Sequence, residues 1–166
     1  MNSKELQEKA KSIRRSIIKM IYTAKSSHIG CSLSSADILA ALYFGGVLRV
    51  DPKNPSDPNR DRFILSKGHG VSAVYSTLAE RGFFPKEKLE EYGKNGTTLA
   101  SHIVLNVVPG AETSNGSGGH GLPLGVGMAV AARFDKSQAR IFVLSGDGEL
   151  EEGSVWEAAL FAGFHK

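Results

Sequence analysis

The order of apolar and polar residues predicts a chain in which helices alternate with short strands. Apolar residues between Leu6 and Ile21 recur at the spacing of one helix face, which predicts an amphipathic helix from Ser3 to about Ala24. Phe63–Leu65 and Ile141–Leu144 are short apolar runs that predict buried strands, the second of them a central strand. This alternation predicts an α/β fold with a mostly parallel sheet flanked by helices.

Capping residues and residues that interrupt helices predict where the other elements lie. Ser34, followed by Asp37 at the matching position, is expected to cap a helix that reaches about Phe44. Further helices are expected at Val71–Arg81, Pro85 to about Tyr92, Gly121–Phe134 and Ser154–Gly163, with irregular backbone at 26–33, 51–61 and 93–118. A long irregular segment inside a compact domain is usually either functional or wrongly assigned, and both interpretations stay open for residues 93–118.

Length, composition and charge narrow the class of protein. A chain of 166 residues fits one domain. The 20 lysines and arginines exceed the 17 acidic residues only slightly and are scattered, which argues against nucleic acid and is compatible with a phosphate-bearing ligand. Cys31 is the only cysteine, and neither a signal peptide nor a membrane span is seen. We therefore expect a cytoplasmic protein that does not act on membranes.

The segment Gly146-Asp147-Gly148 follows the apolar run Ile141–Leu144 directly. Ligands of parallel sheets lie beyond the carboxyl ends of the strands, where this segment falls. A carboxylate there can coordinate Mg²⁺, and flanking glycines allow phosphate oxygens to come close. Asp-Gly is also a common turn, but the preceding strand and the Glu-Gly-x-x-Trp-Glu pattern of Glu152–Glu157 favour the metal interpretation.

The run from Leu144 to Ala159 resembles the thiamine-diphosphate motif of transketolases. It is most similar to the motif of the amino-terminal subunit in split, two-chain transketolases. Three further segments follow the order of that family: Ala24–Gly30, Ser66–Gly70 and Gly116–Pro123. Because these segments span nearly the whole chain, the resemblance implies a thiamin diphosphate-binding fold with thiamine diphosphate and Mg²⁺ as cofactors.

The resemblance also implies roles for individual residues. Asp147 would bind the Mg²⁺ that holds the diphosphate, between Gly146 and Gly148. The implied catalytic residues are His28, His69 and His102, and the implied cofactor-binding residues are His69, Gly116, Gly118, Gly146, Asp147, Gly148, Glu152 and Glu157. Histidines suit this chemistry because they exchange protons near neutral pH while substrate hydroxyls change protonation.

The implied roles differ among these residues. His69 would lie near the diphosphate and the reacting centre, whereas His28 and His102 would line the substrate channel. Gly116 and Gly118 would approach the aminopyrimidine and the central part of the cofactor. Glu152 and Glu157 would lie at a subunit interface that links paired cofactor sites.

Several neighbouring residues have a simpler interpretation. Glu149 and Glu151 are as readily solvated as functional. His120 stands where the family usually has a glutamine, and packing is expected for it. Trp156 is expected in a core or an interface, and His165 is expected to have no role.

Parts of the family pattern are absent from the sequence. The second magnesium ligand of the family, an asparagine further along the chain, would lie beyond Lys166, as would the strand that carries it. The pyrimidine-binding domain, whose glutamate activates the cofactor ring, belongs to a second chain in split enzymes. Residues 1–166 are therefore expected to form an incomplete cofactor domain that lacks its C-terminal part, needs a pyrimidine-binding partner subunit in an oligomer, and is inactive alone.

Two functions are compatible with the sequence, and a third is disfavoured. The leading hypothesis is a transketolase subunit that transfers a two-carbon ketol unit from a ketose phosphate to an aldose phosphate, as in the pentose phosphate pathway. The alternative is a truncated, non-catalytic remnant with at most a role in assembly. A magnesium-dependent phosphohydrolase would need an upstream Asp-x-Asp segment after an early strand, which the sequence does not contain.

Overall fold

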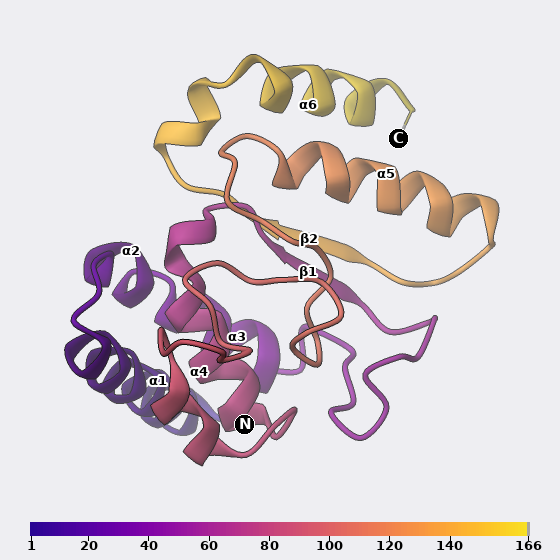
Figure 1. Ribbon diagram of the computed structural model, residues 1–166. Coiled ribbons are helices and arrows are strands. Elements are labelled where there is room, and N and C mark those ends of the chain that lie inside the picture. The colour runs from indigo at the N-terminus through magenta and orange to yellow at the C-terminus, as the bar shows by residue number, and fades with distance from the viewer. Residues whose placement is uncertain (166) are drawn as a thin grey trace.

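The computed structural model describes residues 1–165 and has the expected α/β architecture. A two-stranded parallel sheet lies between a layer of N-terminal helices and a layer of C-terminal helices (Figure 1). The elements in chain order are α1 (Ser3–Ala24), α2 (Ile29–Leu33), α3 (Ala36–Phe44), β1 (Arg62–Leu65), η1 (Gly68–Gly70), α4 (Val71–Arg81), η2 (Lys86–Glu91), α5 (Gly121–Phe134), β2 (Ile141–Leu144), η3 (Gly148–Glu151) and α6 (Gly153–His165). The elements named η are short 3₁₀ helices.

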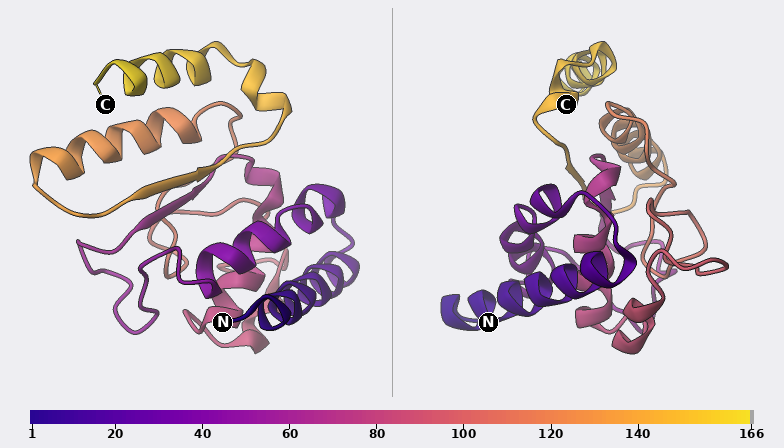
Figure 2. Two further views of the ribbon diagram at one scale, coloured as in Figure 1. Left: turned by 180° about the vertical axis from the view of Figure 1, so that it is seen from behind. Right: turned by 60° about the vertical axis from the view of Figure 1, so that its left-hand side comes forward.

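The N-terminal layer contains the hydrophobic core. Helices α1, α3 and α4 contact one another, and the side chains of Phe63 and Leu65 in β1 belong to the same core. The helix α1 begins with a capping box, in which Asn2 accepts a hydrogen bond from the Glu5 amide and donates one to the Glu5 carboxylate. The opposite layer is thinner: α5 contacts both strands, α6 contacts α5, and α6 lies far from α1 (Figure 2).

The expected cap of the second helix is wrong. The helix α3 begins after Ser35, and no side chain caps it. The unexpected helix α2 lies within the segment predicted to be irregular, and the hydroxyls of Ser34 and Ser35 donate to the carbonyl of Cys31 at its end. Asp37 instead pairs with Arg14 of α1. Contacts with α1 and α2 therefore replace the local capping box.

The two strands end at the same edge of the sheet. Arg62 is paired with Ile141 and Leu65 with Leu144, in parallel register. The side chains of Phe63–Leu65 are buried, whereas those of β2 are only half-buried. The prediction that Ile141–Leu144 is a buried central strand is therefore wrong for residues 1–165, because β2 pairs there with β1 alone.

The amino ends of the strands are joined by an ionic cluster. Asp61 is fully buried just before β1, and it accepts hydrogen bonds from the backbone amides of Arg49 and Arg140 at 2.9 Å each. The two guanidinium groups donate to the same carboxylate at 2.7 and 2.6 Å. Burial by itself would raise the pKa of Asp61, but these hydrogen bonds outweigh it and hold the pKa well below its usual range.

The segment between η2 and α5 is irregular, as expected, and passes over the carboxyl end of β1. The side-chain amide of Asn115 donates to the carbonyl of Leu65 at 2.7 Å, and the hydroxyl of Tyr75 donates to the carbonyl of Ala100 at 3.0 Å. These bonds hold the segment against β1 and α4. Among residues 1–165, no helix combines the length and the apolar character that a membrane crossing requires.

Candidate active site

Three segments meet where the parallel strands end. The amide of Ser66 continues the sheet by donating to the carbonyl of Leu144 at 2.9 Å. The hydroxyl of Ser66 accepts a hydrogen bond from the amide of Gly121, the first residue of α5, at 3.0 Å. The segments after β1, before α5 and after β2 are therefore in contact at one edge, which is where an α/β sheet binds its ligand.

The histidines predicted to be catalytic come from different segments and gather around η1. The rings of His28 and His69 lie 5.5 Å apart, centroid to centroid. His28 has a left-handed backbone, φ +70°, between α1 and α2, and its Nδ1 lies 3.0 Å from the hydroxyl of Ser27. A β-carbon on Gly68 would lie 2.9 Å from the ring of His102, so this third ring lies directly against η1.

His69 has an altered affinity for protons. Its pKa is lowered from the ordinary histidine value, chiefly because burial disfavours the charged ring. Positive charge on His28, Lys67 and His102 lowers it further, in that order after burial, with the charge of Glu149 opposing them. A neutral imidazole is therefore favoured at neutral pH, and a neutral imidazole can accept a proton from a hydroxyl.

Asp147 lies at the surface beyond β2, at the start of η3. Its side chain has no hydrogen bond or ion pair within residues 1–165, and a β-carbon on the following Gly148 would meet no atom within 4 Å. Within the same residues, no group of three or more His, Cys, Asp or Glu side chains is placed to hold a metal. An exposed carboxylate of this kind can bind Mg²⁺ together with oxygens from phosphate and water, because Mg²⁺ commonly takes only one or two carboxylates from a protein.

The glycine segment before α5 has exposed backbone and a side-chain acceptor, the Oδ1 atom of Asn115, that a ligand could contact. The Oδ1 atom of Asn115 is buried and accepts no hydrogen bond from the described residues. It lies beside Gly116, which has a φ of +149°, a conformation favourable to glycine. An unpaired buried acceptor next to exposed glycine backbone fits a ligand that carries a hydrogen-bond donor, such as an aminopyrimidine. Gly118 is exposed and adjoins Glu149, where an added β-carbon would lie 3.6 Å from the Cβ of that residue.

The two glutamates expected at an interface are not part of the histidine group. Glu152 is exposed, and its Cβ packs against the turn at Gly119, where φ is +76° and an added β-carbon would lie 2.7 Å away. Glu157 is exposed on α6. Trp156 is 61% exposed, so it lies outside the core of residues 1–165, and its interface role stays a prediction. Packing of His120 is wrong: this residue is exposed, with its Nδ1 2.9 Å from the carbonyl of Gly118.

The hydrogen bonds of Glu149 could not be predicted from its place in the sequence. Its carboxylate accepts hydrogen bonds from the hydroxyl of Ser66 at 2.6 Å, the amide of Gly119 at 2.7 Å and the amide of Gly146 at 2.7 Å. Two of these donors lie 83 and 30 residues away along the chain, so no local pattern could have indicated them. Glu149 therefore joins all three segments of the candidate site.

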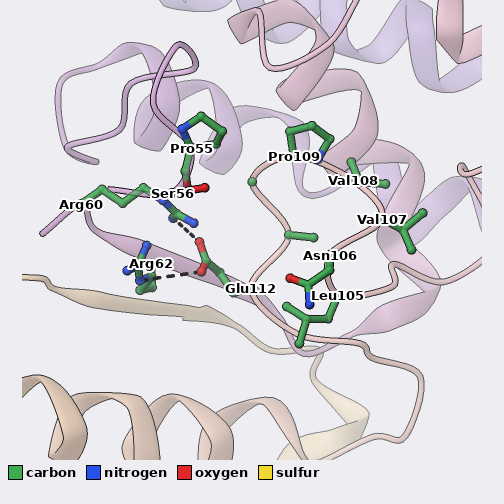
Figure 3. A pocket seen from close by; sticks show the side chains of 12 residues that line it. Pro55, Ser56, Arg60, Arg62, Leu105, Asn106, Val107, Val108, Pro109 and Glu112 are labelled. Carbon is green, nitrogen blue, oxygen red and sulfur yellow. Dashed lines mark hydrogen bonds and ion pairs between the residues drawn. The ribbon is translucent and has the colours of Figure 1, made fainter. Parts of the chain in front are cut away.

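A hollow at the amino ends of the strands is a separate feature (Figure 3). On one side of it, the guanidinium groups of Arg60 and Arg62 point towards Glu112, and both form ion pairs with that carboxylate. Its walls come from residues 55–62 and 105–112. Because its charged side chains pair with one another and it lies away from the carboxyl ends, we do not assign the ligand site to it.

Comparison with known proteins agrees with this geometry. The family described as "Transketolase, thiamine diphosphate binding domain" matches residues 6–166. An apulose-4-phosphate transketolase subunit of Phocaeicola vulgatus is 43% identical over 100% of this chain and 58% of its own length. The protein of the same name from Actinobacillus succinogenes is 47% identical over 98% of this chain and 59% of its own length. A 6-deoxy-6-sulfo-D-fructose transketolase subunit from a Clostridium species is 44% identical over 96% of this chain and 58% of its length.

Solved structures show the same likeness. The transketolase of Campylobacter jejuni superposes with a TM-score of 0.93 at 35% identity, covering 100% of this chain and 27% of that one. The transketolase of Leishmania mexicana gives 0.89 at 29% identity, covering 98% and 26%. The chain spans somewhat more than half the length of the apulose-4-phosphate transketolase relatives. The sequence match and the fold agree, and the chain belongs to the transketolase family, because its residues 6–166 match the thiamine-diphosphate-binding domain of that family.

Proposed function

We propose that this chain is the cofactor-binding subunit of a two-chain transketolase. It would hold thiamine diphosphate and Mg²⁺ and, with a partner subunit that supplies the pyrimidine-binding domain, transfer a two-carbon ketol unit from a ketose phosphate to an aldose phosphate. The observation that carries this proposal is the meeting of His28, His69 and His102 with the glycine segments at the carboxyl edge of the sheet. The names of the relatives, which describe them as transketolase subunits, support a second chain.

Different residues of this chain would have different roles in such a site. Asp147 would hold the magnesium, and the backbone at Gly146 and Gly148 would face the diphosphate. When bound, thiamine diphosphate supplies a nucleophilic carbon for breaking and forming carbon–carbon bonds. His69, whose lowered pKa favours the neutral ring, would accept a proton from a sugar hydroxyl, and His28 beside it would hold that hydroxyl.

The substrate is proposed only as a class. Relatives are named for apulose 4-phosphate and for 6-deoxy-6-sulfo-D-fructose, which are sugars that carry an anionic phosphate or sulfo group. The slight excess of positive charge on this chain suits an anionic sugar. Ordinary pentose phosphates and modified ketose phosphates are therefore the compounds to test.

The test is cofactor binding followed by ketol transfer. The chain is mixed with the pyrimidine-domain chain that completes the enzyme of one of these relatives, and thiamine diphosphate is titrated by calorimetry with Mg²⁺ or with a chelator. We expect binding that requires Mg²⁺, thermal stabilisation by the cofactor and transfer between sugar phosphates. No binding in either condition would overturn the proposal and support the non-catalytic remnant.

Asp147 provides the sharpest variant for this test. Asp147→Asn keeps the shape of the side chain but removes the charge that Mg²⁺ requires, so cofactor affinity should fall by at least about tenfold. Glu151→Gln is the matched control, since it removes a charge from an exposed side chain in the same 3₁₀ helix. Unchanged affinity in Asp147→Asn would refute the ligand assignment.

A further inference from the structure

The carboxylate of Glu149 lies between the ends of both strands and the loop before α5. Its Oε1 atom accepts from the amide of Gly146, and its Oε2 atom accepts from the hydroxyl of Ser66 and the amide of Gly119. All three distances are 2.6–2.7 Å, in the range of hydrogen bonds to an ionised acceptor. Ser66 extends the network, because its oxygen also accepts from the amide of Gly121.

The donors are backbone and hydroxyl groups that border the proposed ligand positions. Gly146 precedes Asp147, and Gly119 follows Gly118. Besides Glu149, the amide of Leu150 donates to the carbonyl of Asp147 at 3.2 Å, and the hydroxyl of Ser154, near the start of α6, donates to the carbonyl of Gly119 at 2.9 Å. Ser154 joins the loop to α6, whereas the Glu149 side chain joins it directly to the turn, because its carboxylate accepts from the amides of both Gly119 and Gly146.

We propose that Glu149 is a positioning residue, which sets the Gly146–Gly148 turn against the Gly116–Gly119 loop so that the magnesium-diphosphate group meets an ordered site. This inference rests on the proposed function. Binding is tighter when the groups that contact a ligand are already held in place, because less ordering is needed on association.

The chemistry of the side chain makes the proposal sensitive to a single substitution. A carboxylate presents acceptors at both oxygens, whereas a glutamine presents one oxygen and one NH₂ group. In Glu149→Gln, the NH₂ group must face either the amide of Gly146 or the donors on the other side, and one link is lost. Glu149→Gln has nearly the same size as the wild type, so it separates loss of the link from loss of packing.

A role of Glu149 through its charge and a role through positioning predict opposite changes in cofactor affinity. A negative charge near a diphosphate repels it, so if Glu149 acted only through its charge, Glu149→Gln would bind the cofactor more tightly. If Glu149 acts by positioning, the same substitution weakens binding. We expect about tenfold weaker affinity for thiamine diphosphate with Mg²⁺, the size of one lost hydrogen bond to a charged group. Glu151→Gln, which removes the same charge from an exposed side chain nearby, should leave affinity within about twofold of the wild type.

The experiment combines calorimetry with amide exchange in the mixture of both subunits. We expect weaker cofactor binding in Glu149→Gln and, without cofactor, faster exchange at the amides of Gly119 and Gly146 than in Glu151→Gln. Ser66→Ala should also weaken binding, and the double variant should weaken it by less than the product of the single effects, because both act through one link. Equal or tighter binding in a folded Glu149→Gln protein would overturn the proposal.

Failure of the proposed function is distinguishable from failure of this inference. If the wild-type protein binds no thiamine diphosphate, the proposed function fails, and amide exchange still decides whether Glu149 orders the two segments. Unchanged exchange in Glu149→Gln then overturns the link, and faster exchange confined to these amides supports it. Far-ultraviolet circular dichroism of each variant verifies that the fold is retained.

Discussion

The two ends of the sheet use aspartate in opposite ways. At the amino ends, Asp61 is fully buried, and two arginines and two backbone amides surround its carboxylate. At the carboxyl ends, Asp147 is exposed and has no side-chain partner within residues 1–165. Both residues adjoin apolar strands and differ in what surrounds them. A carboxylate whose hydrogen bonds are satisfied by the protein stabilises the fold, whereas one left open can bind a cation.

The carboxyl end also contains a satisfied acid, which sharpens this contrast. Glu149 has three protein donors, as Asp61 has several, and lies two residues from the open Asp147. One acid therefore holds the backbone of the proposed site while another is left to bind. Ion pairs of Asp61 therefore hold the amino ends of the strands together, whereas the carboxyl ends present a carboxylate that is free to bind.

The largest expected effect is on the free energy of unfolding, which should depend on the aspartate at the amino ends and not on the one at the carboxyl ends. Asp61→Ala leaves the backbone amides of Arg49 and Arg140 without their acceptor and should lower the free energy of unfolding by about 3 kcal/mol. Asp147→Ala removes no side-chain hydrogen bond or ion pair among residues 1–165, and it should change the free energy of unfolding by less than about 0.5 kcal/mol. Urea unfolding of the wild type and both variants measures the two values. Equal losses in the two variants would remove the contrast.

A second effect tests how closely the carboxyl end is packed. In Gly121→Ala, the new β-carbon would lie 2.3 Å from the Cβ of Ser66 and 2.7 Å from its Cα, so backbone must move. We expect a loss of about 2 kcal/mol in unfolding free energy. Gly127→Ala in the same helix is the matched control, since its β-carbon meets open space, and it should stabilise by about 0.5–1 kcal/mol. Thermal unfolding of both variants compares them, and a tolerated Gly121→Ala would contradict the close approach.

The smallest expected effect is the pH dependence of the unfolding free energy that Asp61 causes at the amino ends of the strands. The pKa of Asp61 is lowered in the folded protein, so its contribution to stability is present above the unfolded pKa, near 3.9, and is lost as pH falls below it. Between pH 6 and pH 3 the loss should be about 1 kcal/mol. Asp61→Asn should lack this part of the pH dependence, which urea unfolding at several pH values measures. An Asp61→Asn protein that loses stability with acid as the wild type does would contradict the assignment.

The elements that depend on local pattern were predictable. The spacing of apolar residues predicted α1, the helix expected at Val71–Arg81 is α4, and the two apolar runs predicted β1 and β2. The glycine segments and the aspartate after β2 indicated where the site lies, because the carboxyl ends of parallel strands share one edge. Burial of β2 was not predictable from its residues, since an apolar run carries no information on which neighbours cover it.

The capping box at Ser34 shows why local rules can fail. The sequence pattern is correct for a cap, yet Asp37 pairs with Arg14, which is 23 residues away. An ion pair across two helices replaced a local hydrogen bond, and only the packing of α1 on α3 brings these side chains together.

What the sequence by itself determined is the two strands, the helices other than α2, the family resemblance and the residue types that chemistry at the site would need. What only the tertiary structure decided is which acid is open and which is bound. Asp147 and Glu149 are two residues apart and carry the same charge, but the donors that satisfy Glu149 come from Ser66 and Gly119. A hydrogen bond depends on distance in space, and distances between remote segments are set only when the chain folds.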